Sequence, residues 1–190
     1  MSRYTGPKEK IIRNLKLNLL PGLKNTMIKM KKAGRRRPPK QYKSRLIEKQ
    51  KLKYYYGLTE RQLINYFLKA KQAEGSTADR LLVSLEMRLD NISFRLGLAP
   101  SIPAARQLVT HGHILVNDKK VHAPAYVCKP GDTIQIKEIL HSNEQKTGSI
   151  KKRANHLQQT ENGGRVLGLA RKQSLPFKIN DLRVIEYYSK

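Results

Sequence analysis

Apolar residues recur at helical spacing in three stretches of the chain. The first stretch, residues 42–56, is followed by Gly57, which favours a helix C-terminus at that point. In the second, Thr59 is followed three residues later by Gln62, the pattern of a capping box, and Gly75 is placed to end the helix. We therefore predict two consecutive helices, each with one apolar face.

The third stretch is the most regular. Ser76 and Asp79 can begin it as Thr59 and Gln62 begin the second, and Gly97 is placed to end it. Its apolar residues recur at intervals of four, four, three and four, at Leu81, Leu85, Leu89, Ile92 and Leu96. This spacing predicts one continuous amphipathic helix.

The pattern changes after residue 101. Ser101 can cap a short helix that has Pro103 in its first turn and ends at Gly112. Apolar and polar residues then alternate over residues 114–121 and 126–136, as expected of strands joined by turns. The positions expected to face inward are Ile114, Val116, Ile134 and Ile136. Two helices packed on a small sheet give an α+β fold.

Charge narrows the class of partner. The 190 residues include 39 Lys and Arg against 14 Asp and Glu, which gives a net charge of +25, while only 38% of residues are hydrophobic. No run approaches the roughly 18 apolar residues of a membrane span. An amphipathic membrane anchor would need bulky apolar residues, yet Trp is absent and Phe occurs three times. A nucleic acid is the partner we expect, ahead of a membrane surface or an acidic protein.

Most of the excess charge lies near the N-terminus. Residues 1–53 contain 18 Lys and Arg but only two acids, Glu9 and Glu48. We expect an arm, residues 1–41, that is largely disordered until nucleic-acid phosphates neutralise it. A basic targeting signal is the alternative for its arginine cluster. The candidate RNA contacts of the arm and the helices after it are Arg3, Lys8, Lys10, Arg13, Arg35, Arg36, Arg37, Lys40, Lys43, Arg45, Lys49, Lys53 and Arg61.

Polar donors gather where the last helix meets the first hairpin. Arg106, Thr110 and His113 follow one another at i, i+4 and i+7, which places them on one helix face. The hairpin turn and its neighbour add lysines. The candidate RNA contacts of this corner are Arg88, Arg106, Gln107, His111, His113, Lys119, Lys120 and Lys129. A patch on a rigid base can set the register of binding, which a flexible arm cannot.

No metal or cofactor is expected. His111 and His113 flank a glycine, but no third ligand lies near them in the sequence. The single cysteine, Cys128, permits no internal disulfide and is expected to be a buried apolar side chain in a reducing compartment. We expect the histidines to hydrogen-bond to RNA, with a structural role as the alternative.

Several longer motifs carry a family resemblance. MRLDNISFRLGLAPSIPAARQLVTHGHILVNDKKV, followed by YVCKPGDTIQI, resembles the small RNA-binding module named after ribosomal protein S4. SRYTGPK, EKQKLKYYYGLTERQL and INDLRVIEYYSK are similar to the S4 ribosomal protein family itself, so the resemblance covers most of the chain. LPGL, IPAARQLV, CKPGD and EYYSK resemble its plastid-encoded members most.

The resemblance implies a domain organisation. An S4-type module of two helices on a short, mostly antiparallel sheet, residues 87–139, would be inserted into an all-helical domain. Residues 42–86 and 180–190 would form that domain, after the arm of residues 1–41. Residues 140–179 match nothing in the family and are expected to be a linker or variable insertion. Some bacterial relatives hold their N-terminal segment around zinc with four cysteines, which this region lacks.

The resemblance also implies a function. Family members are structural components of the small ribosomal subunit and primary binders of its RNA at a multi-helix junction, where they nucleate assembly and contribute to translational accuracy. Implied partners are neighbouring ribosomal proteins, including the S5 type, and messenger RNA near its entry site. The expected location is the plastid ribosome, with an organelle-encoded gene, and a bacterial cytoplasm is the alternative. We expect no membrane and no small-molecule substrate.

Two rival classes share the module. Pseudouridine synthases carry it, and Arg88, Leu89 and Asp90 imitate their catalytic motif, but no catalytic domain follows. Asp90 is more simply expected to pair with Arg88 or to cap a local turn. A stand-alone RNA-binding factor would not need the basic arm or the C-terminal segment. We therefore expect no catalytic residue.

Overall fold

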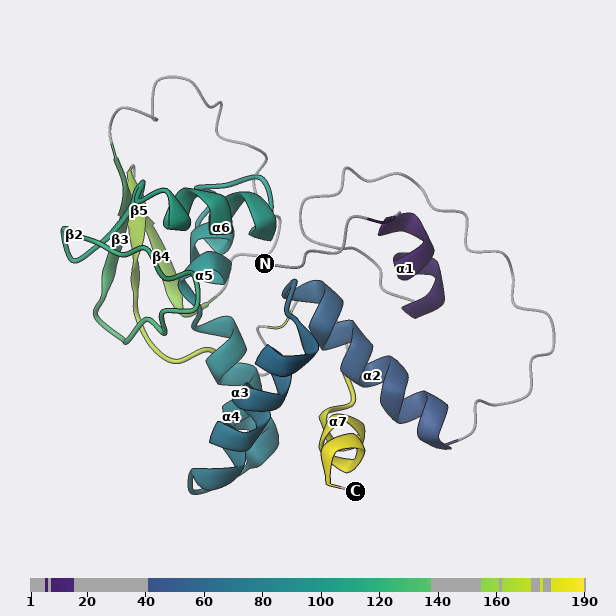
Figure 1. Cartoon of the computed structure of the whole chain (residues 1–190). Coiled ribbons are helices and arrows are strands. Elements are labelled where there is room, and N and C mark those ends of the chain that lie inside the picture. Colours follow the sequence, from purple (N-terminus) through teal and green to yellow (C-terminus); the bar gives the residue numbers. More distant parts are fainter. Residues whose placement is uncertain are drawn as a thin grey trace. The chain divides into compact units, whose positions relative to one another are not determined.

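The computed structural model describes residues 6, 8–15, 41–137, 155–160, 162–171, 175 and 179–189. The chain forms two compact units, and the boundary between them falls within one helix. The helical unit comprises Met1–Leu81 and Phe177–Lys190, and the sheet-containing unit comprises Leu82–Pro176. The fold class is α+β, as the sequence predicts (Figure 1).

The first two predicted helices are confirmed. They are α2 (Gln41–Tyr55) and α3 (Glu60–Gln72), and Gly57 between them has φ 59°. The capping box of α3 is complete, because Thr59 Oγ1 accepts from the Gln62 N–H at 3.3 Å and Gln62 Oε1 accepts from the Thr59 N–H at 3.0 Å.

A helix from the far end of the sequence lies against α2. This helix, α7 (Asp181–Tyr188), begins at the Asn180 cap (Figure 1). Arg45 of α2 donates to Glu186 at 2.7 Å, and the Tyr188 hydroxyl donates to Glu60 at 3.0 Å. The helical unit is therefore built from segments at both ends of the chain.

A short helix also forms within the expected basic arm. Residues Lys8–Leu15 form α1, and its buried Ile11, Ile12 and Leu15 contact Ile47 and Tyr54 of α2. The pattern of the sequence had assigned no element there. Residues 16–40 lie outside the described residues, so the expectation that the arm is largely disordered before RNA binding stays a prediction.

The prediction of one continuous helix across Leu81–Leu96 is wrong. Two helices occupy this stretch, α4 (Thr77–Glu86) and α5 (Leu89–Arg95), separated by an extended Arg88 with ψ 140°. A neighbouring segment takes over the backbone hydrogen bonds at the break. Tyr126 O accepts from the Leu89 N–H at 2.8 Å, and the Cys128 N–H donates to Met87 O at 2.8 Å.

The fourth helix and the two strand segments match the expected pattern. Helix α6 (Ile102–Thr110) is capped by Ser101, whose side chain accepts from the Ala104 N–H. The strands are β1 (Ile114–Val116), β2 (Lys119–Lys120), β3 (Thr133–Ile136), β4 (Leu157–Thr160) and β5 (Gly163–Val166). They form one antiparallel sheet in the order β2-β1-β3-β5-β4.

Strands β4 and β5 lie in the stretch 140–179, to which the sequence pattern gave no element. Strand β5 pairs with β3, Thr133 lying opposite Arg165 and Ile134 opposite Gly164. The two glycines permit this close approach. A Cβ on Gly163 would lie 1.9 Å from the Ile134 carbonyl oxygen, and a Cβ on Gly164 would meet Leu96 at 2.4 Å.

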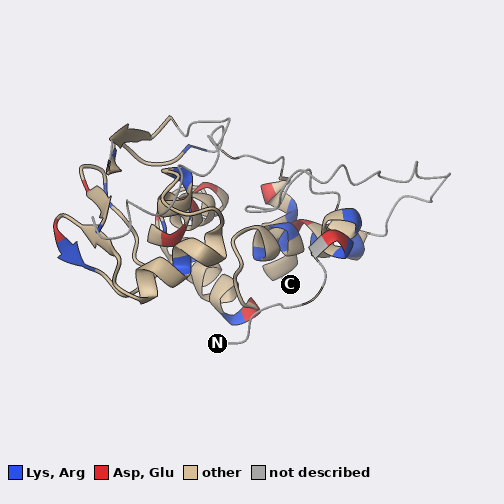
Figure 2. Ribbon diagram, turned by 90° about the horizontal axis from the view of Figure 1, so that it is seen from above, with Lys and Arg blue, Asp and Glu red and all other residues tan. Residues whose placement is uncertain are grey.

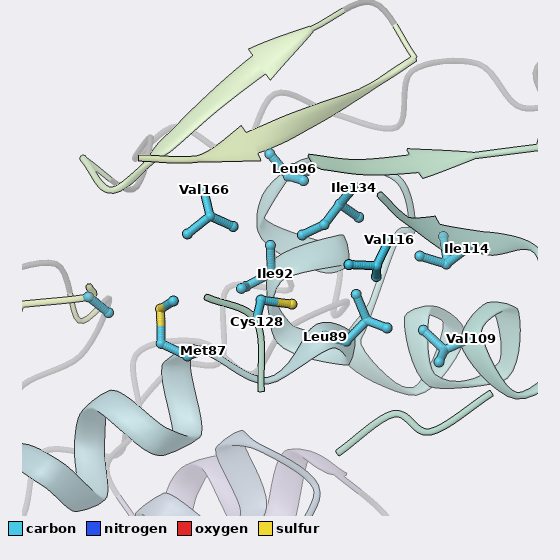
Figure 3. Packing of buried hydrophobic residues seen from close by; sticks show 11 residues of the cluster. Met87, Leu89, Ile92, Leu96, Val109, Ile114, Val116, Cys128, Ile134 and Val166 are labelled. Carbon is cyan, nitrogen blue, oxygen red and sulfur yellow. The ribbon is translucent and has the colours of Figure 1, made fainter. Parts of the chain in front are cut away.

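One apolar core joins α5 and α6 to the inner face of the sheet (Figure 3). Leu89, Ile92, Val109, Ile114 and Ile134 are fully buried in it. These side chains point toward one another from both layers in Figure 3. Cys128 is buried in the same cluster, as expected, and burial raises the pKa of its thiol to about 12, which keeps it protonated and unreactive.

Gly163 provides a test of the unexpected β3–β5 pairing. Gly163→Ala should separate the two strands, because the clash is with a backbone carbonyl that cannot rotate away. We expect the free energy of opening at the paired amides to fall by about 1–3 kcal/mol, measured by hydrogen exchange at Ile136 and Val166.

Gly168→Ala is the matched control. A Cβ at Gly168 has no heavy atom within 4 Å, so the same chemical change should leave exchange nearly unaltered. Equal exchange rates in the two variants would contradict the pairing of β5 with β3.

Candidate nucleic-acid interface

The corner between α6 and β1 is held by its own backbone. The His111 N–H donates to Gln107 O at 2.9 Å, and the His113 N–H donates to Leu108 O at 3.0 Å. Gly112 between them is buried with φ 72°, and a Cβ there would lie 2.6 Å from the His122 ring. A larger residue at 112 would therefore be strained, which accounts for glycine at the turn.

The buried Asp90 of α5 holds α6 in place at this corner. Its carboxylate accepts from Arg88 at 2.7 and 3.0 Å and from Arg106 at 2.7 and 3.0 Å. The Asn91 N–H adds a further hydrogen bond at 2.9 Å. Asp90 is only 1% exposed, so a buried charge is stabilised by two guanidinium groups. The expected pairing of Asp90 with Arg88 is confirmed.

This arrangement separates two arginines that the sequence had grouped together. The Arg88 side chain is 2% exposed and directed at Asp90, so in this conformation it does not form part of the surface. The Arg106 side chain is 15% exposed and reaches the same carboxylate from α6. Arg106 therefore orients α6 against α5, and a small fraction of its side chain reaches the surface.

The other corner residues lie at or near the surface. Gln107 and His111 are exposed and His113 is half-buried. The His111 and His113 rings stack at a centroid distance of 6.1 Å with 23° between their planes. Two nearly parallel imidazole rings beside the side-chain amide of Gln107 can stack on a base and also hydrogen-bond to it.

A tight turn brings Lys119 and Lys120 beside the corner. Asn117 and Asp118 both have positive φ, 49° and 62°, as a two-residue hairpin turn requires. The Asn117 side chain donates to Asp132 at 2.8 Å, and the Lys129 N–H donates to the same carboxylate at 2.7 Å. Both lysines are exposed on β2, which appears as a blue strand at the edge of the sheet (Figure 2). Lys129 is exposed in the adjoining turn.

The candidate residues of the helical unit divide into exposed and engaged groups. Lys10, Arg13, Lys43 and Arg61 are exposed. Lys49 is instead 4% exposed, with its ammonium 2.8 Å from Glu60 and 4.6 Å from the centroid of the Tyr187 ring. Arg45 pairs with Glu186 and Lys53 with Glu60 at 3.5 Å. The buried Lys49 therefore stabilises this unit and does not face a ligand, whereas Arg45 and Lys53 keep part of their side chains at the surface.

The remaining candidates cannot be located. Arg3, Arg35, Arg36, Arg37 and Lys40 lie outside the described residues, and of Lys8 only the backbone position within α1 is described. One residue that the sequence reasoning missed is His122, which is exposed and lies 3.3 Å from Thr110 O, against the corner glycine. Its separation of 12 residues from Thr110 gave no local signal.

Two other kinds of site are absent from the described residues. Among the residues that the structure describes, no group of three or more His, Cys, Asp or Glu could hold a metal ion. Within that part of the chain, no helix is both long and apolar enough to span a bilayer.

Comparison with known proteins gives the family. The S4 domain family matches residues 87–134, and the family described as the ribosomal protein S4/S9 N-terminal domain matches residues 3–86. Over 201 residues the chain is 48% identical to the small ribosomal subunit protein uS4c of Physcomitrium patens, covering 100% of this chain and 99% of that protein. The chain belongs to the S4 family of small ribosomal subunit proteins. The match is to the plastid type of that family.

Further members of the S4 family agree over the same length. The uS4c proteins of Chaetosphaeridium globosum and Hookeria lucens are 48% and 49% identical over 205 and 202 residues, with 100% of this chain and 99% of each relative covered. The two family matches meet between residues 86 and 87, where α4 ends before α5. The helix break thus coincides with the boundary between the two family matches.

Removal of the Asp90 carboxylate tests its anchoring role. Asp90→Ala leaves the buried Arg88 guanidinium without the group that accepts its two hydrogen bonds. We expect a loss of roughly 3–5 kcal/mol in the unfolding free energy, measured by urea denaturation.

Glu74→Ala is the comparison, since it removes one negative charge from an exposed position. Its effect should stay within about 0.5 kcal/mol. If the two variants unfold at the same urea concentration, the Asp90 network does not hold the corner together.

Proposed function

We propose that this protein is a structural, RNA-binding component of the plastid small ribosomal subunit, and that its folded corner recognises a junction of several RNA helices. Family membership supports the first statement, because the relatives are ribosomal proteins and not enzymes. The single observation that carries the second is the corner itself. There, exposed donors stand on a turn that backbone hydrogen bonds and a buried carboxylate hold in place.

RNA chemistry explains why rigidity matters here. The deep groove of an RNA helix is too narrow for side chains to read, so a branched RNA is recognised through its shape, its phosphates, its 2′-hydroxyls and its unpaired bases. Gln107 and the lysines of β2 can bind phosphates and hydroxyls, and the stacked His111 and His113 rings can contact an unpaired base. A set of donors held at fixed spacing can distinguish a junction from a plain duplex.

The basic arm has a different task in this proposal. With 13 Lys and Arg against one acid over residues 1–41, it supplies affinity by displacing counterions from RNA, whatever the RNA sequence. The corner then sets the register. Proposed RNA contacts are Arg3, Lys8, Lys10, Arg13, Arg35, Arg36, Arg37, Lys40, Lys43, Arg45, Lys53 and Arg61 outside the module, and Arg106, Gln107, His111, His113, Lys119, Lys120 and Lys129 within it. Arg88 and Lys49 are left out because both are buried.

The remaining features of the proposal rest on the family resemblance. The junction is placed in the 5′ domain of the small-subunit RNA and is bound early in assembly. In the finished subunit, the protein contacts a neighbouring S5-type protein and lies near the messenger RNA entry site, where it contributes to decoding accuracy.

The rival enzymatic function finds no support at Asp90. Both carboxylate oxygens accept hydrogen bonds, and the side chain is 1% exposed, so neither oxygen is available to attack a nucleotide. A stand-alone RNA-binding factor would have no use for α7, whose contacts with α2 complete the helical unit.

The corner can be tested against the arm with charge-matched variants. Lys119→Ala with Lys120→Ala should weaken binding to a junction transcript by on the order of tenfold per lysine, because a hydrogen bond to a charged group contributes about 1.5–3 kcal/mol. Arg36→Ala with Arg37→Ala should weaken junction and duplex binding alike. Filter binding to a 5′-domain transcript and to a plain RNA duplex measures both.

The informative quantity is the ratio of the two affinities. Only the corner variant should lose its preference for the junction over the duplex. An equal loss of preference in both variants would show that the corner does not set the register.

The arm predicts a steep dependence on salt. Eight phosphate contacts give a slope of about −6 to −7 in a plot of log affinity against log salt concentration. Replacing Arg35, Arg36 and Arg37 together by Ala should make that slope shallower by roughly two to three units. Titration of the full chain against the 5′-domain transcript between low and moderate salt measures both slopes, and a nearly flat wild-type curve would refute the role of the arm.

A further inference from the structure

The sheet has a second face that the proposed corner does not use. Helices α5 and α6 cover one face, into which Ile114, Val116, Ile134 and Val166 are buried. Side chains alternate along a strand, so their neighbours point to the opposite side. In Figure 1 no described helix or strand of this unit lies over that opposite side. We call it the outer face.

The register of the sheet decides which residues share the outer face. Leu115 lies opposite both Lys120 of β2 and Gln135 of β3. One step further, the Lys137 N–H donates to His113 O at 3.0 Å, which places these two residues side by side. Arg165 of β5 lies opposite Thr133 on one side and Gln158 of β4 on the other. The outer face therefore carries His113, Leu115, Lys120, Thr133, Gln135, Lys137, Gln158 and Arg165.

This set of residues carries three cations and no acid. The residues of the five strands include no Asp or Glu. Lys120 and Lys137 lie close enough that the charge of Lys120 lowers the pKa of Lys137. Lys120, Gln158 and Arg165 are exposed, and the acids Asp118 and Asp132 lie in turns rather than on the strands. Two neighbouring ammonium groups repel each other until an anion lies between them.

Alternation also separates the two lysines of β2. Lys119 lies opposite Val116, a core residue, and Lys120 lies opposite Leu115, an outer-face residue. The edge strand thus presents one cation to the helix side and one to the outer side. A polyanion bound at the corner can follow this edge from one face of the sheet to the other.

We propose that the outer face is a second contact surface for the RNA phosphate backbone, continuous with the corner through His113 and Lys120 and centred on Lys137 and Arg165. This proposal rests on the function proposed above and extends it to residues that the sequence had not indicated. Lys137 is four residues from Thr133, the partner of Arg165, so the two cations are about 13 Å apart along the strands. They therefore contact separate phosphates.

The side chains favour RNA over other partners. Leu115 is the only large apolar side chain among the strand residues of this face, and the exposed Leu167 directly follows β5, so an apolar protein interface or a membrane has little to bury there beyond these two side chains. Amide, hydroxyl and imidazole donors between the cations suit phosphates and 2′-hydroxyls. An acidic protein segment is the other anionic ligand, and the experiment below includes it.

The test replaces Lys137 and Arg165 by Ala in the full chain. Binding to the 5′-domain transcript should weaken by on the order of tenfold or more, and the salt slope should become shallower by about two. Hydroxyl-radical footprinting should lose a set of protected nucleotides different from the set lost in the Lys119→Ala, Lys120→Ala variant. Lys137→Arg alone should retain both affinity and protection.

The control carries the same loss of charge elsewhere. Lys69→Ala with Lys71→Ala removes two exposed cations from α3, and it should change the slope by less than one and leave the footprint intact. Because Lys137 and Arg165 do not belong to the apolar core, circular dichroism of the variant should match the wild type. Single replacements of Lys137 and Arg165 serve if the double variant fails to fold.

The outcomes distinguish this proposal from the one on which it rests. If the wild type prefers the junction but the Lys137, Arg165 variant behaves like the α3 control, the outer-face proposal is overturned and the corner stands. If the wild type itself shows no preference for the junction, the proposed function fails. Unchanged RNA binding combined with lost binding to a poly-glutamate peptide would assign the face to an acidic protein and overturn the RNA assignment.

Discussion

One buried carboxylate determines how the corner between α6 and β1, the proposed RNA-binding site, is built. Asp90 accepts hydrogen bonds from Arg88, at the break between α4 and α5. It also accepts from Arg106 of α6, which lies 16 residues after Asp90 in the sequence. A lone carboxylate would be costly to bury, and so would a lone guanidinium, but together they are stable only when α5 and α6 meet in one arrangement. The end of α6, the turn at Gly112 and the start of β1 all follow from that arrangement.

Pairing with an acid also divides the positive charges of the molecule into two groups, buried and exposed. Arg88, Arg95 and Lys49 are buried and held by acids, so they contribute to the net charge without contributing to the binding surface. On the described strands of the sheet, the exposed cations are Lys119 and Lys120 of β2 and Arg165 of β5, and Lys137 directly follows β3. The number of Lys and Arg in the sequence is therefore larger than the number of cations that the fold leaves available to a ligand.

Local signals in the sequence gave the helix ends and the inward residues of β1 and β3, because caps, turns and alternation act over a few residues. Two features escaped for physical reasons. The helical spacing of apolar residues continues unbroken from Leu85 to Leu89. The backbone between them is nevertheless extended at Arg88, because Tyr126, far along the sequence, accepts the hydrogen bond of the Leu89 N–H. Strands β4 and β5 contain several polar residues and two adjacent glycines, a composition typical of a loop. Only the pairing of β5 with β3, which is distant in sequence, makes this segment a strand. The partner of Arg106 is likewise non-local.

The contact between α2 and α7 sets an order of events during synthesis. Residues 41–55 emerge early, but their partner, residues 181–188, emerges after the whole sheet-containing unit. The unit that begins first is therefore completed last, and the part of α2 that packs against α7 stays uncovered until the sheet-containing unit has been synthesised. A nascent chain could thus dock its finished module on RNA before the helical unit has closed, which would couple the folding of this protein to the assembly of its particle.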